Sequence, residues 1–360
     1  MPLAPVILAL LSAALFGAAT PVSKWLLSEL NPFQLAGLLY LGAALGVAPF
    51  AIHGGQSGLP HRSDRRNRAR LLGAIVAGGM LGPVALLFGL RLAEAASVSL
   101  WLNLELAATA VLGVCFFHDN LNLRGWMGVA AALTAAALLS SSHGAAGFTA
   151  GGLVLVACLC WGLDNHLTAL IDGITPSQTT FWKGVTAGIV NLTIGIALGS
   201  LAASWQVLAA ALAVGAVSYG ASIVLYVRSA QALGATRAQV LFSSAPFFGV
   251  AFAVVFLGES LSWVHAPAAV LFVCAVALLL AQSHAHQHTH KAIHHQHTHR
   301  HDDGHHNHCH PGLPPSTRHT HQHEHEPLVH SHPHWPDLHH RHGHSSRSER
   351  GSEEGSERKE

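Results

Sequence analysis

The stretch that decides the fold is RSDRRNRARLLGAIVAGGMLGPVALLFGL, residues 62–90, in which an arginine cluster precedes a long apolar run. A helix that crosses a bilayer needs about 20 mostly apolar residues, and Leu71–Leu92 meets that requirement. Arginine and lysine gather in the cytoplasmic loops of membrane proteins. The stretch therefore predicts a membrane-spanning helix that begins at the cytoplasmic side.

Nine further apolar segments of similar length, joined by short connections, fill residues 1–281. Half of all residues are hydrophobic and only 10% are charged, whereas an average soluble domain carries about 25% charge. We therefore predict an all-α integral membrane protein. Its ten expected transmembrane helices are Leu3–Leu27, Phe33–Ile52, Leu71–Leu92, Ala95–Phe117, Leu123–Ser140, Ala150–Ile171, Thr179–Gly199, Trp205–Val227, Ala238–Leu257 and Trp263–Ala281.

The basic residues predict the orientation of these helices. If the N-terminus is cytoplasmic, residues 62–70, Arg124 and the turn from Arg228 to Arg237 are all cytoplasmic too. The opposite loops hold only Lys24 and Arg91, both at helix ends. Ten helices return the chain to the side where it began, so we expect a bacterial inner-membrane protein with both termini in the cytoplasm.

The two halves of the membrane part resemble each other. Residues 15–17 (LFG) match residues 160–162 (CWG), and residues 118–121 (HDNL) match residues 258–261 (GESL). The matched motifs lie 140 to 145 residues apart. This spacing predicts a first repeat over residues 1–142 and a second over residues 143–281. Five helices are an odd number, so the second repeat must be inverted in the membrane. Inverted repeats are typical of carriers that bind their solute where the repeats meet.

These motifs resemble a known family. Residues 92–97 (LAEAAS), 104–105 (LE) and 117–121 (FHDNL), with their second-half counterparts 232–236 (ALGAT), 245–246 (AP) and 257–261 (LGESL), resemble the EamA-type permeases of the drug/metabolite transporter superfamily. The resemblance implies two five-helix repeats and export of a small solute. Residues 161–168 (WGLDNHLT), with Lys183 and Asn191, resemble a bacterial subgroup with histidine-rich tails. The first half departs from the family by having His118-Asp119 where Gly-Glu is usual.

Charged residues inside the apolar runs are the strongest candidates for a transport site, because a charge at the bilayer centre costs at least about 2.5 kcal/mol. Glu105 lies at four-residue steps from Ser97, Trp101 and Thr109, so a regular helix places all four on one face. Glu105 is either a carboxylate that couples a proton or cation to transport, or one partner of a buried ion pair with Lys183.

Asp164 shares a helix face with Trp161 and Thr168, whereas His166 lies about 200° around the helix. His166 is therefore a packing residue, or a ligand only if the helix unwinds. Asn165 and Asn191 are candidates for hydrogen bonding between helices. A proline inside a helix leaves a backbone carbonyl without its helical donor. Such a proline either provides a carbonyl that binds substrate or merely permits a kink. The candidate substrate and coupling residues are Glu105, Asp164, Lys183, Trp101, Trp161, His166 and Asn191.

Residues 282–360 form a different kind of segment. Of 30 histidines, 24 lie between His284 and His344, and no apolar periodicity accompanies them. We therefore expect a disordered tail. Neutral imidazole is a good ligand for zinc, nickel, cobalt and copper, although low-complexity drift would produce the same affinity incidentally. The candidate metal ligands are His284, His286, His288, His290, His294, His295, His297, His299, His301, His319, His321, His323, His325, His330, His332 and His334.

Together these patterns predict a secondary-active exporter of a divalent transition metal ion or its complex, with the tail capturing metal. Export of an organic metabolite or drug, and a membrane-anchored metal store or sensor without transport, remain alternatives. The chain lacks a G-x-x-x-x-G-K-[ST] run, so ATP-driven pumping and enzyme activity are not expected, nor a cofactor in the membrane part. The expected partners are the lipid bilayer and a small solute. A net charge of +1 indicates no nucleic-acid partner, and a homodimer is compatible with the sequence.

Overall fold

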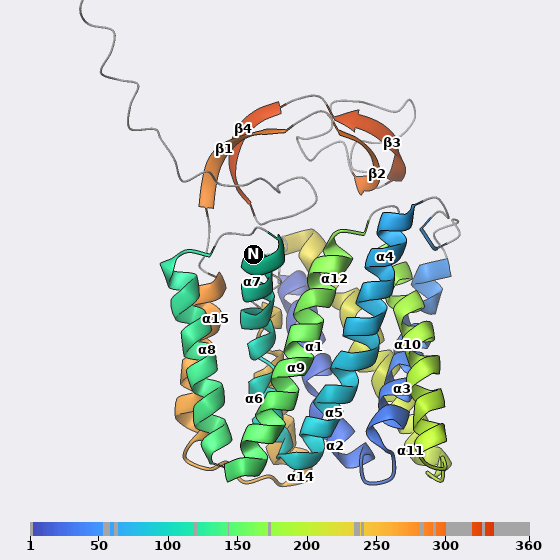
Figure 1. The fold of residues 1–360 in the computed structure, drawn as a ribbon, viewed down its shortest axis with the longest axis vertical. Coiled ribbons are helices and arrows are strands. Elements are labelled where there is room, and N and C mark those ends of the chain that lie inside the picture. Colours follow the sequence, from blue (N-terminus) through green and yellow to red (C-terminus); the bar gives the residue numbers. More distant parts are fainter. Residues whose placement is uncertain are drawn as a thin grey trace, which may run out of the picture.

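A computed structural model of the protein describes residues 3–52, 58–60, 64–117, 121–142, 144–171, 174–229, 238 and 241–280. Of residues 230–233 and of four tail segments, residues 284–290, 293–299, 319–325 and 328–334, it describes the backbone alone. The membrane part is a bundle of helices that run roughly side by side (Figure 1). In chain order its elements are α1 (Leu3–Gly17), α2 (Ala19–Leu26), α3 (Pro32–Ile52), α4 (Arg65–Ala74), η1 (Ile75–Leu81), α5 (Gly82–Leu92), α6 (Ala95–Trp101), α7 (Leu104–Phe117), α8 (Leu123–Ser141), α9 (Gly144–Ala169), α10 (Pro176–Leu198), α11 (Trp205–Val214), η2 (Gly215–Ala221), α12 (Ser222–Leu233), α14 (Ala245–Leu257) and α15 (His265–Leu280).

The predicted helical membrane architecture is confirmed. Among the described residues, eight helical stretches are long and apolar enough to cross a membrane, and several of them join two or three consecutive elements. Two shorter apolar helices, α14 and α15, lie where the ninth and tenth spans were predicted. The sixth span differs at its start, since α9 begins at Gly144 rather than at Ala150.

Each half of the bundle packs chiefly against the other half. In the first half, α1 contacts α12 and α14 of the second half. In the second half, α9 likewise contacts α5 and α7 of the first. The same exchange holds for the central helices, since α3 packs on η2 and α10 packs on η1. In addition, α3 packs on α10, and α8 packs on α15. This exchange of neighbours is what two inverted repeats produce, so the interface between the halves runs through the centre of the bundle.

Small residues allow the closest of these approaches. A Cβ atom on Gly42 of α3 would lie 3.0 Å from Gly215 Cα in η2 and would overlap the Leu212 carbonyl oxygen. A Cβ atom on Gly184 of α10 would lie 2.7 Å from the Tyr40 carbonyl oxygen in α3. Backbone-to-backbone packing of this kind is typical of helices in a membrane.

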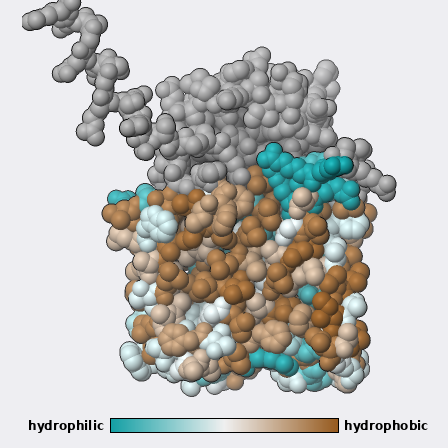
Figure 2. Space-filling view, in the orientation of Figure 1, coloured by the Kyte–Doolittle hydropathy of each residue, from teal (hydrophilic) through white to brown (hydrophobic). Residues whose placement is uncertain are grey.

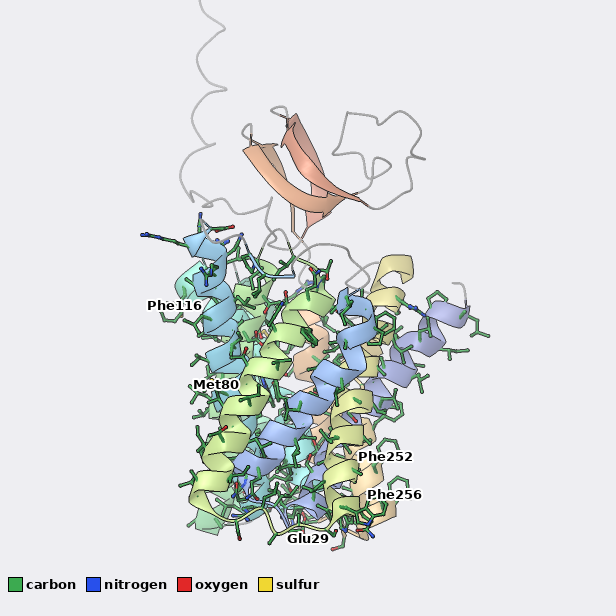
Figure 3. All side chains as sticks on the ribbon, turned by 90° about the vertical axis from the view of Figure 1, so that its right-hand side faces the viewer. Glu29, Met80, Phe116, Phe252 and Phe256 are labelled. Atoms are coloured by element: carbon green, nitrogen blue, oxygen red, sulfur yellow. The ribbon has the colours of Figure 1, made fainter. Side chains whose placement is uncertain are left out.

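The outer surface has the character expected of a protein in a bilayer. Hydrophobic residues cover the flank of the bundle, and hydrophilic residues gather at the end where α4 begins (Figure 2). Phe252 and Phe256 lie on the flank, and Glu29 lies at the end of the bundle away from the strands (Figure 3). Phe256 is 73% exposed. Exposed aromatic side chains of this kind face lipid once the protein is embedded.

The tail holds four segments with strand geometry. Strand β1 (His284–His290) pairs antiparallel with β4 (Leu328–His334), and β2 (Ile293–His299) pairs antiparallel with β3 (His319–His325). This pairing differs from the disorder that we expected for residues 282–360. The His-x-His alternation has the two-residue period of a strand, and the backbone hydrogen bonds of a ladder need no apolar face. Two-stranded ribbons are marginally stable in water, so disorder of the isolated tail stays a prediction.

Candidate functional site

Two short π-helices occupy matching positions in the two halves. In the first half η1 separates α4 from α5, and in the second half η2 separates α11 from α12. A π-helix shifts the backbone hydrogen bonds from the fourth residue to the fifth, and it is found frequently at functional sites. Both π-helices lie against the central pair of helices, since α10 contacts η1 and α3 contacts η2.

In η1 the shifted pattern leaves a carbonyl without a helical donor. Gly82 donates its N–H to the Ala77 carbonyl, and the next donor in this pattern would be Pro83, which has no N–H. The Gly78 carbonyl is therefore free for side chains. It accepts hydrogen bonds from the Tyr40 hydroxyl (2.5 Å) and from Trp161 Nε1 (3.1 Å).

The neighbouring carbonyl, that of Gly79, lies four residues before Pro83 and also loses its α-helical donor. It accepts a hydrogen bond from Asn191 Nδ2 of α10 at 3.2 Å. In η2, by contrast, the Ser218 carbonyl accepts from the hydroxyl of Ser222, the first residue of α12 in the same half. The freed carbonyls of η1 thus tie the first half to Trp161 and Asn191 of the second half.

An ion pair lies beside these carbonyls. Lys183 Nζ of α10 is 2.5 Å from Asp164 Oδ2 of α9, and the two side chains are only 16% and 8% exposed. Asp164 Oδ1 also accepts a hydrogen bond from the Thr168 hydroxyl at 2.9 Å. A Cβ atom at Gly78 would overlap the Asp164 carboxylate. The missing side chain of Gly78 therefore gives the carboxylate its place against η1.

Glu105 is placed differently from the ion pair that the sequence suggested. Its Oε1 accepts a hydrogen bond from Asn165 Nδ2 of α9 at 3.0 Å, and among the described residues Lys183 forms its ion pair with Asp164. Pairing of Glu105 with Lys183 was therefore the wrong assignment. The reason is geometric, because the Asp164 carboxylate on the neighbouring helix α9 occupies the position beside the Lys183 ammonium. Glu105 still lies within electrostatic reach of both Asp164 and Lys183.

The shared helix face proposed for Ser97, Trp101, Glu105 and Thr109 holds for only part of the set. Glu105 and Thr109 of α7 both accept from Asn165 Nδ2, at 3.0 Å and 3.4 Å, whereas Ser97 of α6 contacts His265 Nε2 at 3.2 Å. The span breaks between α6 and α7, at Leu102 and Asn103, so the two ends do not continue one regular helix. Trp101 Nε1 donates to the Ala136 carbonyl of α8 at 3.3 Å, and its side chain is fully buried. Trp101 thus packs in the core, and its side-chain hydrogen bond goes to α8 rather than to α9, where Glu105 finds its partner.

The ring of His166 makes its contacts away from the Asp164–Lys183 pair in the part of the chain that the structure describes. Its Nε2 is 2.9 Å from the Thr109 carbonyl oxygen, and its ring stacks on Phe117 with centroids 4.3 Å apart. The packing role is thus what the geometry shows for this histidine.

No pattern in the sequence singled out Tyr40 or Tyr219, which the structure places near the π-helices. Tyr40 lies in the middle of α3 and Tyr219 in η2, with ring centroids 6.1 Å apart. Phe16 stands edge-on to Tyr219 at 5.6 Å. A tyrosine in an apolar run carries no signal of its own, whereas the sequence match of Phe16 with Trp161 is a signal that both face the opposite π-helix.

The proposed metal ligands of the tail have no described side chains, and His301 lies outside the described residues altogether. The register nevertheless pairs histidine with histidine across both ribbons: His284 with His334, His286 with His332, His288 with His330, His295 with His323, His297 with His321 and His299 with His319. Among the side chains that the structure does describe, no group of three histidine, cysteine, aspartate or glutamate residues could hold a metal ion.

Known proteins share this chain's sequence and fold. A protein named as an uncharacterized transporter from Methanothermobacter thermautotrophicus is 26% identical over 286 residues, which is 73% of this chain and 82% of the relative. A solved crystal structure matches with a TM-score of 0.53 and 15% identity, covering 77% of this chain and 96% of its own. That likeness concerns the fold alone.

The family comparison covers both halves of the membrane part. The model of the EamA-like transporter family matches twice, over residues 3–141 and over residues 149–281. The two matches agree with the two inverted halves and leave the histidine-rich tail outside. The chain belongs to the EamA-like transporter family and is a multi-pass membrane transporter.

Proposed function

We propose that the protein is a secondary-active exporter that binds a small solute between its two halves, at η1 and the Asp164–Lys183 pair. The observation that supports this site most directly is the position of the pair. It lies against the freed carbonyls of Gly78 and Gly79, where side chains of both halves converge. Carriers built from inverted repeats bind their solutes at such broken helices.

Glu105 is the proposed coupling residue. It comes from the first half and its hydrogen-bond partner Asn165 is an uncharged amide of the second half. A carboxylate in this position can exchange a proton for a cationic group of the solute without first breaking an ion pair. The Asp164–Lys183 pair would then open to admit a solute that offers its own charges to both partners.

The donors at the site bear on the kind of solute. A bare divalent cation would meet the Lys183 ammonium, and like charges repel strongly where water is scarce. A metal ion carried as a complex, or a polar organic solute, suits the mixture of carbonyl, indole, phenol and amide groups better. We therefore propose a metal complex as the first substrate class and an organic metabolite or drug as the second.

The tail is the reason for ranking a metal complex above an organic solute as the substrate class. Its cross-strand histidine pairs lie at register positions that suit chelation, because directly opposed residues have Cβ atoms about 4.5–5.5 Å apart. We propose that the tail binds zinc, nickel, cobalt or copper at the cytoplasmic mouth of the carrier. Deprotonated imidazole is required, so this affinity should fall as the pH drops from about 7 to 5.

The transport proposal is tested with purified full-length chain in proteoliposomes. Labelled nickel, cobalt, zinc and copper, each with and without an organic chelator, are compared with a panel of amino acids and drugs. Glu105→Gln keeps the shape of the side chain and should abolish proton-coupled transport. Glu29→Gln is the matched control, because Glu29 accepts a hydrogen bond from the Ser204 N–H at the far end of the bundle. Full activity of Glu105→Gln would remove that residue from the mechanism.

The role of the tail is tested in cells. If the membrane part carries metal, truncation after Ala281 should weaken metal tolerance without abolishing it. A chimera with residues 282–360 on one unrelated transmembrane helix tests the alternative of a metal store. Equal protection by that chimera would end the metal-carrier proposal.

A further inference from the structure

The segment that joins α5 to α6 is held at one end of the bundle by side chains from other elements. Lys24 Nζ of α2 donates to the Leu90 carbonyl at 2.7 Å and to the Ala93 carbonyl at 2.9 Å. Leu90 lies in the last turn of α5 and Ala93 directly follows the helix, so neither carbonyl has a helical donor of its own. On the proposed topology this end faces the outside of the cell.

The second contact comes from the other half of the protein. Both carboxylate oxygens of Glu259 accept hydrogen bonds from α6, one from the Ala95 N–H and one from the Ala96 N–H, each at 2.8 Å. Gly258 ends α14 in the left-handed conformation (φ +68°), which only glycine adopts without strain. The Gly-Glu motif thus has a physical role: glycine makes the turn, and the glutamate joins α14 of the second half to α6 of the first.

One turn into α6 from these hydrogen bonds, the Ser99 side chain packs against the backbone of α14 at Gly249. A Cβ atom at Gly249 of α14 would lie 2.5 Å from Ser99 Oγ and 3.1 Å from the Gly17 carbonyl oxygen of α1. Ser99 is buried, and its hydroxyl has no hydrogen-bond partner among the described residues. A buried hydroxyl without a partner destabilises the state that buries it. This closed contact therefore carries a free-energy cost that separation of α6 from α14 would relieve.

We propose that Glu259 is the positioning residue that latches the external end of the carrier shut, and that opening to the outside breaks its two hydrogen bonds and separates α6 from α14. This inference rests on the proposed transport function and on the proposed topology. Hydrogen bonds from backbone N–H groups to a carboxylate are roughly twice as strong as neutral ones. They hold the closed state, while the unpaired Ser99 hydroxyl, which water reaches once the helices part, favours the open one.

The attraction between Lys24 and Glu259 adds to the latch. The two side chains interact electrostatically, and Lys24 interacts with Glu94 as well. Glu94 immediately precedes α6 but makes no side-chain hydrogen bond to its backbone. Glu94→Gln therefore removes the same charge beside the same helix and leaves the Glu259 hydrogen bonds intact, which makes it a matched control.

The test measures external access to position 99. Ser99→Cys places a thiol between α6 and α14, and a membrane-impermeant thiol reagent is added from outside to cells that carry the full-length chain. A parallel sample with Ser99 intact corrects for the native cysteines. Adding Glu259→Gln should raise the labelling rate about tenfold, the effect of losing one strong contact of the closed state. Glu94→Gln should change it little, and Glu259→Asp, which keeps the charge, should restore part of the protection.

Two results would overturn the latch. One is a labelling rate that Glu259→Gln leaves unchanged although the protein accumulates and unfolds at the same temperature as its parent. The other is equal acceleration by Glu94→Gln. If Glu259→Gln fails to accumulate, Lys24→Gln takes its place, since Lys24 holds the same segment and its loss should also expose position 99. Labelling needs no substrate, so its failure is distinct from a failure of the transport assay.

Discussion

At the scale of residues, Asp164 and Lys183 form the most consequential contact of the membrane part. Removing one partner of a buried ion pair leaves the other charge uncompensated and costs about 3–5 kcal/mol, whereas replacing both is far less costly. Asp164→Asn alone should therefore lower the thermal stability of the detergent-solubilised protein and its accumulation in the membrane. Asp164→Asn with Lys183→Gln should recover most of both.

The double variant also separates structure from transport. If the pair binds the solute, the double variant should fold and yet fail to transport. A double variant that transports at the parent rate would show that the pair is only structural. A double variant no more stable than Asp164→Asn would show that the two side chains are not energetically coupled.

Gly78 offers a second prediction at this scale. In an ordinary helix, glycine to alanine stabilises by up to about 1 kcal/mol. A Cβ atom at Gly78 would overlap the Asp164 carboxylate, whereas one at Gly152 of α9 would have no neighbour within 4 Å. Gly78→Ala should therefore impair transport and stability, and Gly152→Ala should be neutral or stabilising. Thermal unfolding and transport assays on both variants decide the matter, and equal behaviour would contradict the assigned role of Gly78.

The sequence identified the charged residues of the site but not their partners. Glu105, Asp164 and Lys183 stood out because charges in apolar runs are rare. Which of them pair depends on how far each helix is rotated about its axis. The break at Leu102–Asn103 changes that rotation for Glu105, and no residue pattern announced the break.

At the scale of elements, the π-helices were beyond prediction for a similar reason. Hydropathy is insensitive to one inserted residue in a helix. Prolines inside the helices, among them Pro83, indicated freed carbonyls without saying which side chains would bind them. The helices themselves were predictable, because their length is set by the bilayer. Alternation of histidine in the tail had the period of a strand, but the absence of an apolar face argued against one.

The tail ribbons carry a prediction of their own. The register puts His286 and His288 of β1 opposite His332 and His330 of β4. Exchanging residues 286 with 287 and 288 with 289 keeps the composition but moves these histidines to the other face. In the full-length chain, calorimetry with nickel should then show weaker binding at the tightest site.

The control for this exchange is to swap residues 306 and 307, which are not among the residues of the four described strands. That swap should leave nickel affinity unchanged. Equal affinities for all three chains would mean that the tail binds metal as a flexible histidine chain, with no ribbon involved.

At the scale of the whole molecule, the orientation in the membrane is open to a direct test. The arginines at residues 65, 66 and 68 are exposed at the start of α4. Exposed Trp25, Trp205 and Trp263 lie in or beside the loops of the other side, as an aromatic belt would. Reporter fusions after Ala69 and Gln282 should therefore be active inside the cell, and fusions after Leu30 and His143 outside. External activity at Gln282 would contradict the proposed topology.

The inverted duplication was predictable from short matched motifs and an odd number of helices, since only inversion lets five helices repeat. The exchange of neighbours between the halves was not, because motifs 140 residues apart say nothing about which helices touch. It follows from packing, as when α1 finds α12 and α14 rather than the rest of its own half.

Because of that exchange, the first half cannot complete its helix packing until the second half has been synthesised. When the first half leaves the ribosome, Ser12 of α1 has yet to meet the Ser222 carbonyl to which it donates, and the Pro5 carbonyl has yet to meet the Ser229 hydroxyl. At about 5–20 residues per second, their partners follow only after roughly ten seconds. During that interval the first half has polar groups and small-residue faces without their final neighbours, open to membrane proteases. A chain that stops at Ser142 should be degraded, and co-expression of residues 143–360 as a separate polypeptide should protect it.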